Sequence, residues 1–154
     1  MPAEVAPAPE VPIGRACVVL LGGRSFAVDV TEAREVVVLE TTTPVPGAPA
    51  AVIGVMNLRG NVLPVVEARP LLGLPIGPRG DRALVLADGE RRAAMVIDGV
   101  LGLTTLDGVQ PTSAAAGHLA VGELNADTGG RATLLDARAM LAEIRRGWDS
   151  GPGG

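Results

Sequence analysis

The sequence predicts an all-β fold made of two similar five-stranded β-barrels packed together, with short helices and one C-terminal helix. Three observations predict this fold class. Short Val-rich runs alternate with Gly and Pro clusters, which favours strands over helices. The same order of runs returns about halfway along the 154 residues. Finally, there is no long crossover helix between the runs, which favours antiparallel pairing.

The first copy of the pattern ends near residue 72. Gly22-Gly23 is a turn pair that joins the first two strands into a hairpin. Pro64 indicates an edge position or a bulge, because proline donates no ladder hydrogen bond. Thr31 could cap a short helical turn through residue 34, and another is expected at 69–72. Strands are expected at 16–21, 25–30, 36–40, 51–58 and 62–66.

After a Gly/Pro connector at 73–80, the pattern begins again. A small polar stretch at 111–117 follows the third strand of this copy. Asp136 is expected to cap a terminal helix through about Arg146, with an apolar face that contains Met140 and Ile144. Strands are expected at 83–87, 92–97, 100–106 and 131–135.

The two copies also match residue by residue at an offset of 69. Residues 64–72 resemble 133–141, and 26–29 resemble 95–98, which indicates one unit used twice. We therefore expect a domain at 15–146 with barrel subdomains at about 15–72 and 81–136. A disordered leader is expected at 1–14, and a flexible tail at 147–154. Because each barrel is small, the two should share a packed seam, and its groove is a candidate binding site.

Composition excludes several classes of function. The net charge of −4 and the near absence of aromatic side chains argue against nucleic acid as a partner. The N-terminus lacks the features of a signal peptide, and no apolar stretch approaches the roughly 20 residues of a membrane helix. A cytoplasmic protein without direct membrane insertion is expected.

Catalytic and metal sites are also disfavoured. His118 is the only histidine and Cys17 the only cysteine, so neither a histidine relay nor a cysteine-based zinc site can be built. We interpret Cys17 as inert packing on a core strand. Glu67 and Asp136 occupy equivalent positions and are interpreted as helix caps rather than an acid–base pair. No enzyme activity, cofactor or metal is predicted.

One segment, residues 54–60, is not explained by secondary structure alone. Its glycines allow close backbone approach. Its arginine, Arg59, carries a planar fork of donors suited to a carboxylate or a carbonyl edge. A hairpin turn whose arginine faces water explains the same residues equally well.

The same segment and the run after it, residues 53–66, resemble the signature of the CheW-like chemotaxis coupling domain. That family shows a G-x-x-N-L-R-G core, an apolar strand with an internal proline, and an acidic-x-Arg turn. Glu67-Ala68-Arg69 supplies the last of these. Further matches lie at 26–29, 34–36 and 96–100, so the resemblance covers about 15–146.

The resemblance implies two SH3-like barrels and a non-enzymatic adaptor associated with chemoreceptor arrays. The implied partners are the cytoplasmic tip of a methyl-accepting chemoreceptor and the regulatory domain of a CheA-type histidine kinase. An amphipathic helix of the tip would lie in the groove between the barrels. The residues implied to bind or support a partner are Val36, Val38, Gly54, Asn57, Leu58, Arg59 and Gly60.

Two alternatives remain open. The connectors at 73–80 and 111–130 are shorter than the usual family pattern, and barrel-end loops form the family's kinase contact. An adaptor that binds the receptor but has lost kinase docking is therefore the first alternative. The second is a small-ligand-binding protein that uses the groove as its pocket.

Overall fold

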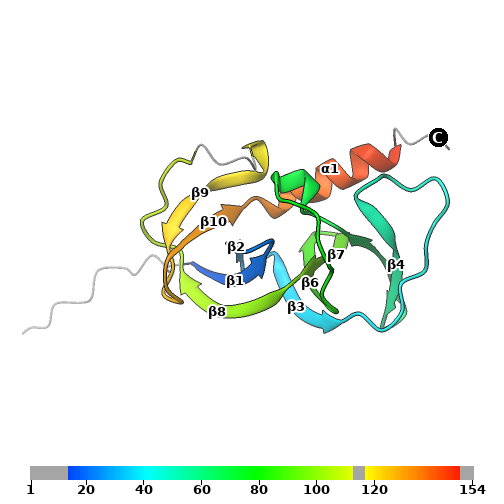
Figure 1. Ribbon diagram of the computed structural model, residues 1–154, viewed down its shortest axis with the longest axis horizontal. Coiled ribbons are helices and arrows are strands. Elements are labelled where there is room, and N and C mark those ends of the chain that lie inside the picture. Colours follow the sequence, from blue (N-terminus) through cyan, green and yellow to red (C-terminus); the bar gives the residue numbers. More distant parts are fainter. Residues whose placement is uncertain (1–13, 113–116, 150–154) are drawn as a thin grey trace, which may run out of the picture.

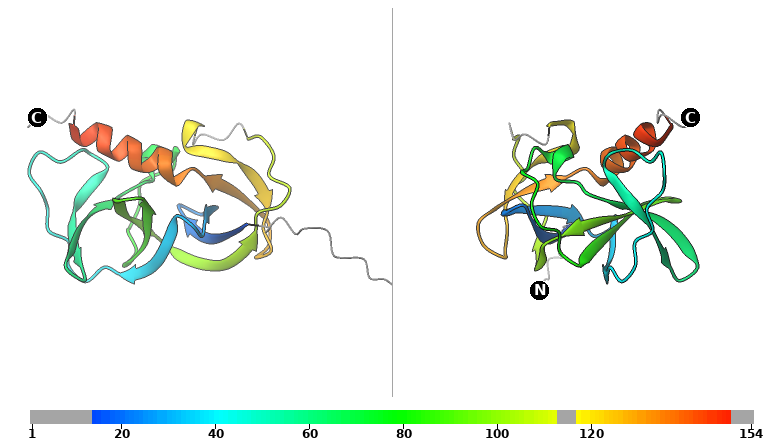
Figure 2. Two further views of the ribbon diagram at one scale, coloured as in Figure 1. Left: turned by 180° about the vertical axis from the view of Figure 1, so that it is seen from behind. Right: turned by 45° about the vertical axis from the view of Figure 1, so that its right-hand side comes forward.

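The computed structural model describes residues 14–112 and 117–149. Two five-stranded sheets lie side by side along the long axis of the molecule (Figure 1). Helix α1 (Ala137–Asp149) runs from the middle of the molecule along one of them, as both views of Figure 2 show. The predicted leader, apart from Gly14, and the last five residues of the predicted tail lie outside the described residues.

The first sheet, called sheet A, has the strand order β8-β1-β2-β10-β9. Its strands are β1 (Arg15–Leu21), β2 (Arg24–Asp29), β8 (Gly99–Thr105), β9 (Ala120–Asn125) and β10 (Arg131–Leu135). Sheet B has the order β3-β6-β7-β5-β4. Its strands are β3 (Ala33–Val38), β4 (Val52–Leu58), β5 (Asn61–Val66), β6 (Arg82–Asp88) and β7 (Arg91–Ile97).

Each sheet combines strands from both halves of the chain. Hairpin β1–β2 lies with β8, β9 and β10, whereas hairpin β6–β7 lies with β3, β4 and β5. Corresponding strands hold corresponding places in the two orders, so the repeat is present in the topology. The copies have exchanged their first hairpins, however, and the expected boundaries at about 15–72 and 81–136 do not separate the sheets. Sequence pattern identifies a strand, but its pairing partner is a long-range choice.

Both sheets contain one parallel pair, which corrects the expectation of purely antiparallel pairing. In sheet A, Ala27 of β2 lies opposite Leu134 of β10. In sheet B, Ala94 of β7 lies opposite Val65 of β5 in the same arrangement. Both pairs join strands from different copies, and no tight turn connects them to impose an antiparallel direction. Among the described residues no ladder joins β8 to β9 or β3 to β4, so the structure shows two sheets rather than two closed barrels.

The expected packed seam is present and is filled with side chains. Phe26 and Val28 of sheet A, Leu86 and Met95 of sheet B, and Met140 of α1 belong to one buried cluster. Two smaller clusters lie within the sheets, one around Leu124 and Leu134 in sheet A and one around Leu63 and Val96 in sheet B. Because the central cluster draws on both sheets and the helix, we expect the three to stabilise one another.

The remaining elements agree with expectation in part. Asp136 caps α1 by accepting a hydrogen bond from the Ala139 N–H at 3.0 Å, as predicted. The helix continues three residues past Arg146, so Trp148 belongs to it. The predicted helical turn from Thr31 through residue 34 is absent: residues 30–32 form a turn, and β3 begins at Ala33. Short 3-10 helices lie at η1 (Pro70–Leu72) and η2 (Gly117–Leu119). Within the described residues no helix is long and apolar enough to span a bilayer.

Strand β9 is absent from the sequence-based prediction. It is an edge strand of sheet A and forms a ladder only with β10. Two of its three inward-facing residues are Ala120 and Gly122, so the apolar signal of its sequence is weak. Gly122 allows the backbone of Gln110 to approach, because a Cβ at this position would lie 2.4 Å from the Gln110 carbonyl oxygen. Gln110 and Glu123 bond through their backbones at 2.8 Å in both directions.

Candidate functional site

The turn between β4 and β5 presents Arg59. Leu58 pairs with Asn61, so the loop contains only Arg59 and Gly60. Their φ angles are 49° and 89°, which fits the type I′ turn of tight hairpins. Among the described residues, Arg59 is the only non-glycine with a positive φ. The Asn57 carboxamide oxygen accepts a hydrogen bond from the Gly60 N–H at 2.9 Å, which stabilises this turn.

Replacing Asn57 by Ala should lower the free energy of unfolding by about 0.5–1.5 kcal/mol, because one side-chain hydrogen bond to the turn is lost. Urea unfolding followed by circular dichroism measures the change. Asn125→Ala is the matched control, since the Asn125 side chain makes no hydrogen bond to the described residues. Equal stability of the two variants would show that Asn57 does not hold the turn.

Arg59 is paired rather than simply solvated. Its guanidinium donates two hydrogen bonds to the carboxylate of Glu35 on β3, one of them from Nη1 to Oε1 at 3.1 Å. Because β3 and β4 are opposite edges of sheet B, this ion pair ties the two edges together. The Arg59 side chain is nevertheless 67% exposed. The hydrogen bond from Arg59 lowers the pKa of Glu35, burial opposes this, and the charge of Arg59 adds to the lowering.

Gly54 supports this region from within. A Cβ at Gly54 would lie 2.6 Å from the Thr43 carbonyl oxygen. The approach is needed because Thr43 and Val55 exchange two backbone hydrogen bonds of 2.9 Å. Gly54 therefore allows the segment after β3 to lie along β4, which is a supporting role.

Several of the other predicted residues meet at one hollow of 530 Å³ between the two edges of sheet B. Val38, which is 53% exposed, lies on the β3 side, and Asn57 and Leu58 lie on the β4 side. Val36 is exposed on the same strand but does not line the hollow. The expected groove between the sheets is not where these residues meet, because the seam is filled by the central core.

The sequence analysis predicted a strand at 100–106 but did not identify it as a candidate binding surface. Strand β8 holds the place in sheet A that β3 holds in sheet B, and both run along the same side of the molecule (Figures 1 and 2). It exposes Val100 and Leu103, at 45% and 51%. Apolar side chains on an exposed edge strand mark a candidate protein-binding surface. The internal repeat was the available signal, because it relates β8 to β3.

The acidic-x-Arg motif forms a buried ion pair. Nε of Arg69 lies 2.9 Å from Oε1 of Glu67, and both residues are almost fully buried. The same guanidinium donates to the carbonyls of Gly77 at 2.8 Å and Pro78 at 3.2 Å. The interpretation of Glu67 as a helix cap is wrong. No side chain caps η1, and the Glu67 carboxylate accepts hydrogen bonds from Arg69 instead. The motif therefore holds the connector at 73–80 in place.

This pairing also sets the ionisation of both groups. Burial alone would raise the pKa of Glu67, but the hydrogen bonds and charge of Arg69 outweigh it, so the pKa lies below its ordinary value. The hydrogen bond to Glu67 raises the pKa of Arg69. Both groups are therefore charged near neutral pH.

Neither Cys17 nor His118 lies in surroundings suited to catalysis. Cys17 packs against the central core, and burial raises the pKa of its thiol, which makes it a weaker nucleophile. His118 is exposed, with its Nε2 3.9 Å from Oε2 of Glu143. In the described part of the chain, no group of three or more His, Cys, Asp or Glu residues is arranged to hold a metal ion.

Comparison with known proteins places these features in a family context. The CheW-like domain matches residues 15–145. The chemotaxis protein CheW of Rhizobium meliloti (strain 1021) is 34% identical over 96 residues, covering 60% of this chain and 62% of that protein. The chemotaxis protein CheW of Bacillus subtilis (strain 168) is 26% identical over 140 residues, covering 86% and 90%. The chain thus spans just over three fifths of the Rhizobium protein.

A solved structure has the same fold. The scaffolding protein TtCheW of Thermoanaerobacter tengcongensis superimposes with a TM-score of 0.71 at 20% sequence identity. The superposition covers 80% of this chain and 89% of that one. The likeness therefore extends over both sheets of the present molecule rather than over one of them.

Proposed function

Because the chain belongs to the CheW-like family, we propose that it couples the cytoplasmic tip of a methyl-accepting chemoreceptor to the regulatory domain of a CheA-type histidine kinase. The resemblance noted in the sequence is confirmed by the family match over residues 15–145. Members of this family are chemotaxis scaffolds and adaptors, so the chain is not an enzyme. In this proposal it works in the cytoplasm, within a receptor array.

The observation that carries the proposal is the way Arg59 is presented. A fixed two-residue turn holds its exposed guanidinium beside the hollow that Val38 and Leu58 line. Such an arrangement suits an amphipathic helix, whose apolar side chains would fill the hollow while a carboxylate binds Arg59. We therefore assign the receptor tip to sheet B, and not to the seam between the sheets.

In each sheet, a side-chain contact joins one edge strand to the turn of the hairpin at the opposite edge, and these contacts support a proposal about the curvature of the sheets. In sheet B, Arg59 joins the β4–β5 turn to Glu35 on β3. In sheet A, Asp127 of the β9–β10 turn accepts a hydrogen bond from the Thr105 N–H of β8 at 3.0 Å. Strands β3 and β8 hold equivalent edges of their sheets, and the β4–β5 and β9–β10 turns are also equivalent, so the same contact occurs in both sheets. We propose that these ties give each sheet the curvature of an SH3-like barrel.

Arg59→Ala should weaken retention of a purified receptor-tip fragment by about tenfold or more, because an exposed, charge-bearing contact is removed. A pull-down with wild type and variant, repeated with the kinase regulatory domain, measures this. Arg131→Ala is the matched control, since Arg131 is also exposed and paired with a glutamate, Glu123, but lies in sheet A. Arg131→Ala should bind as wild type does.

The variant Glu35→Gln tests whether Arg59 contacts the receptor tip directly or only holds β3 in place. If Arg59 acts only by tying β3 to β4, loss of the Glu35 charge should weaken tip binding as much as Arg59→Ala does. If Arg59 binds the tip directly, Glu35→Gln should leave tip binding unchanged or stronger. Equal retention of wild type and Arg59→Ala would remove Arg59 from the contact. Failure of wild type to bind either fragment would overturn the coupling role.

The same pull-down decides between the coupler and its alternatives. Retention of the receptor tip without the kinase domain would favour an adaptor that has lost kinase docking. The short connector at 73–80, which Arg69 holds down, is the feature that favours this second reading. A saturable rise in melting temperature with a metabolite, and no binding of either fragment, would instead favour a small-ligand protein.

A further inference from the structure

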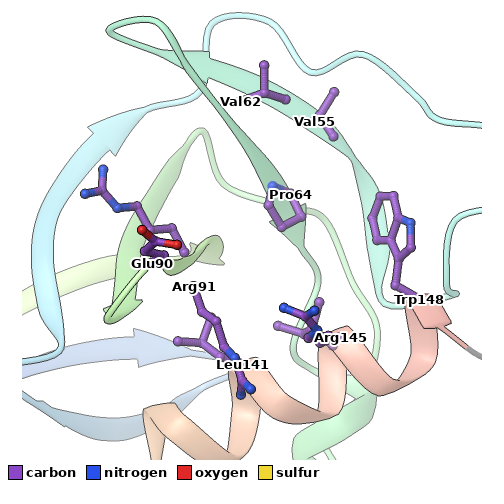
Figure 3. Close-up of a pocket in the computed structure, with 10 residues that line it drawn as sticks. Val55, Val62, Pro64, Glu90, Arg91, Leu141, Arg145 and Trp148 are labelled. Atoms are coloured by element: carbon purple, nitrogen blue, oxygen red, sulfur yellow. The ribbon is translucent and has the colours of Figure 1, made fainter.

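A second groove, of 460 Å³, lies between α1 and the β4–β5 hairpin (Figure 3). Its apolar floor comes from three residues of the hairpin and three of the helix: Val55, Val62, Pro64, Leu141, Ile144 and Trp148. No residue assigned above to the receptor tip lines it. The groove and the hollow nevertheless adjoin, because Val55 and Val62 line both.

Large apolar side chains in this groove face solvent. Val62 is 66% exposed, and the Trp148 indole, which is 38% exposed, rises from the helix towards Val55 (Figure 3). A tryptophan at the rim of an apolar depression is typical of protein-binding sites, because its ring contributes contact area and its N–H can still reach a polar partner.

The rim of the groove is basic on a protein whose net charge is −4. Arg91, Arg92 and Arg145 line it together with a single acid, Glu90. Within the described residues no ion pair joins Arg91 or Arg92 to a carboxylate, in contrast to Arg59. The groove thus combines an exposed apolar floor with the charges of Arg91 and Arg92, which form no ion pair within the described part of the chain.

We propose that this groove docks an acidic amphipathic helix of a partner protein. Apolar residues along one face of that helix would cover Val62 and Trp148, and glutamates or aspartates flanking this face would pair with Arg91 and Arg92. A membrane surface fits less well, because a flat bilayer does not reach a concave floor. The proposal rests on the floor of this groove and on Arg91 and Arg92, although Val55 and Val62 also line the hollow assigned to the receptor tip.

Trp148 makes the groove directly observable. It is the only tryptophan, and the chain has no tyrosine, so tryptophan emission reports on this site alone. The probe is a synthetic helical peptide with leucines on one face and glutamates on both flanks, and its control carries lysines in place of the glutamates. We expect a saturable blue shift with the acidic peptide and little with the basic one, and anisotropy of labelled peptide should give the same affinity.

Arg91→Glu should lower the affinity for the acidic peptide by about fivefold, a modest factor because exposed charge pairs contribute little energy. Adding Arg92→Glu should lower the affinity further. The single variant is easier to interpret, because the charge of Arg92 also lowers the pKa of Glu35, which pairs with Arg59. Arg24→Glu is the matched control, because it reverses the charge of an exposed arginine on β2, and it should bind the acidic peptide as wild type does.

Four results would overturn the proposal: no binding of the acidic peptide, equal binding of both peptides, wild-type affinity in the double variant, or an emission shift with anionic phospholipid vesicles alone.

Discussion

Arg69→Ala should lower the free energy of unfolding by about 3–5 kcal/mol, because it leaves one member of a buried ion pair without its partner. The Glu67 carboxylate would remain buried and charged, and the carbonyls of Gly77 and Pro78 would lose their donor. Urea unfolding followed by circular dichroism at neutral pH measures the change. Of the polar substitutions considered, this one should have the largest effect on stability.

Two further variants test the physical reason. Arg79→Ala removes an exposed arginine of the same connector, whose charge lowers the pKa of Glu67 less than Arg69 does, and it should change stability by no more than about 0.5 kcal/mol. Adding Glu67→Gln to Arg69→Ala should recover part of the loss, because an uncharged group costs less to bury. A destabilisation in Arg69→Ala no larger than in Arg79→Ala would contradict the role assigned to the pair.

The ion pair also gives stability a defined pH dependence. The folded pKa of Glu67 lies below its ordinary value, so the unfolded chain binds this proton more readily than the folded one. The contribution is fully present at neutral pH and is lost as the pH falls below about 4 towards the folded pKa. Glu67→Gln should lack this component of acid unfolding, which distinguishes the pair from other acidic groups.

Phe26→Ala should cost about 3–5 kcal/mol of unfolding free energy, through lost burial and the cavity left behind. Phe26 is the only phenylalanine, is 1% exposed, and lies in the central cluster with residues of sheet B and α1. In wild type, circular dichroism and Trp148 emission should report one urea transition, because the seam couples the sheets. Val100→Ala, at an exposed position of β8, is the control.

Separate transitions by the two probes would show that the sheets unfold independently. The seam would then contribute less than its buried side chains suggest. A Phe26→Ala variant as stable as Val100→Ala would contradict the central cluster as the main source of stability, whatever the number of transitions.

Several features follow from the sequence because they depend on neighbouring residues. Gly22-Gly23 turns the chain between β1 and β2, and Asp136 caps α1, as predicted. Arg59 and Gly60 form the turn of a hairpin, also as expected. Alternating apolar residues and turn residues act over a few positions, so the sequence displays them directly. The non-enzymatic, CheW-like class of the protein was likewise evident from motifs that are short and contiguous.

Other features belong to the tertiary structure alone. The exchange of hairpins between the copies, the parallel pairs at Ala27 and Ala94, and the pairing of Arg59 with Glu35 all join residues far apart along the chain. So does the groove between α1 and β4–β5. The two copies carry similar strands, so either hairpin satisfies the local pattern in either sheet. Only the packing of the whole chain around the shared seam selects one arrangement.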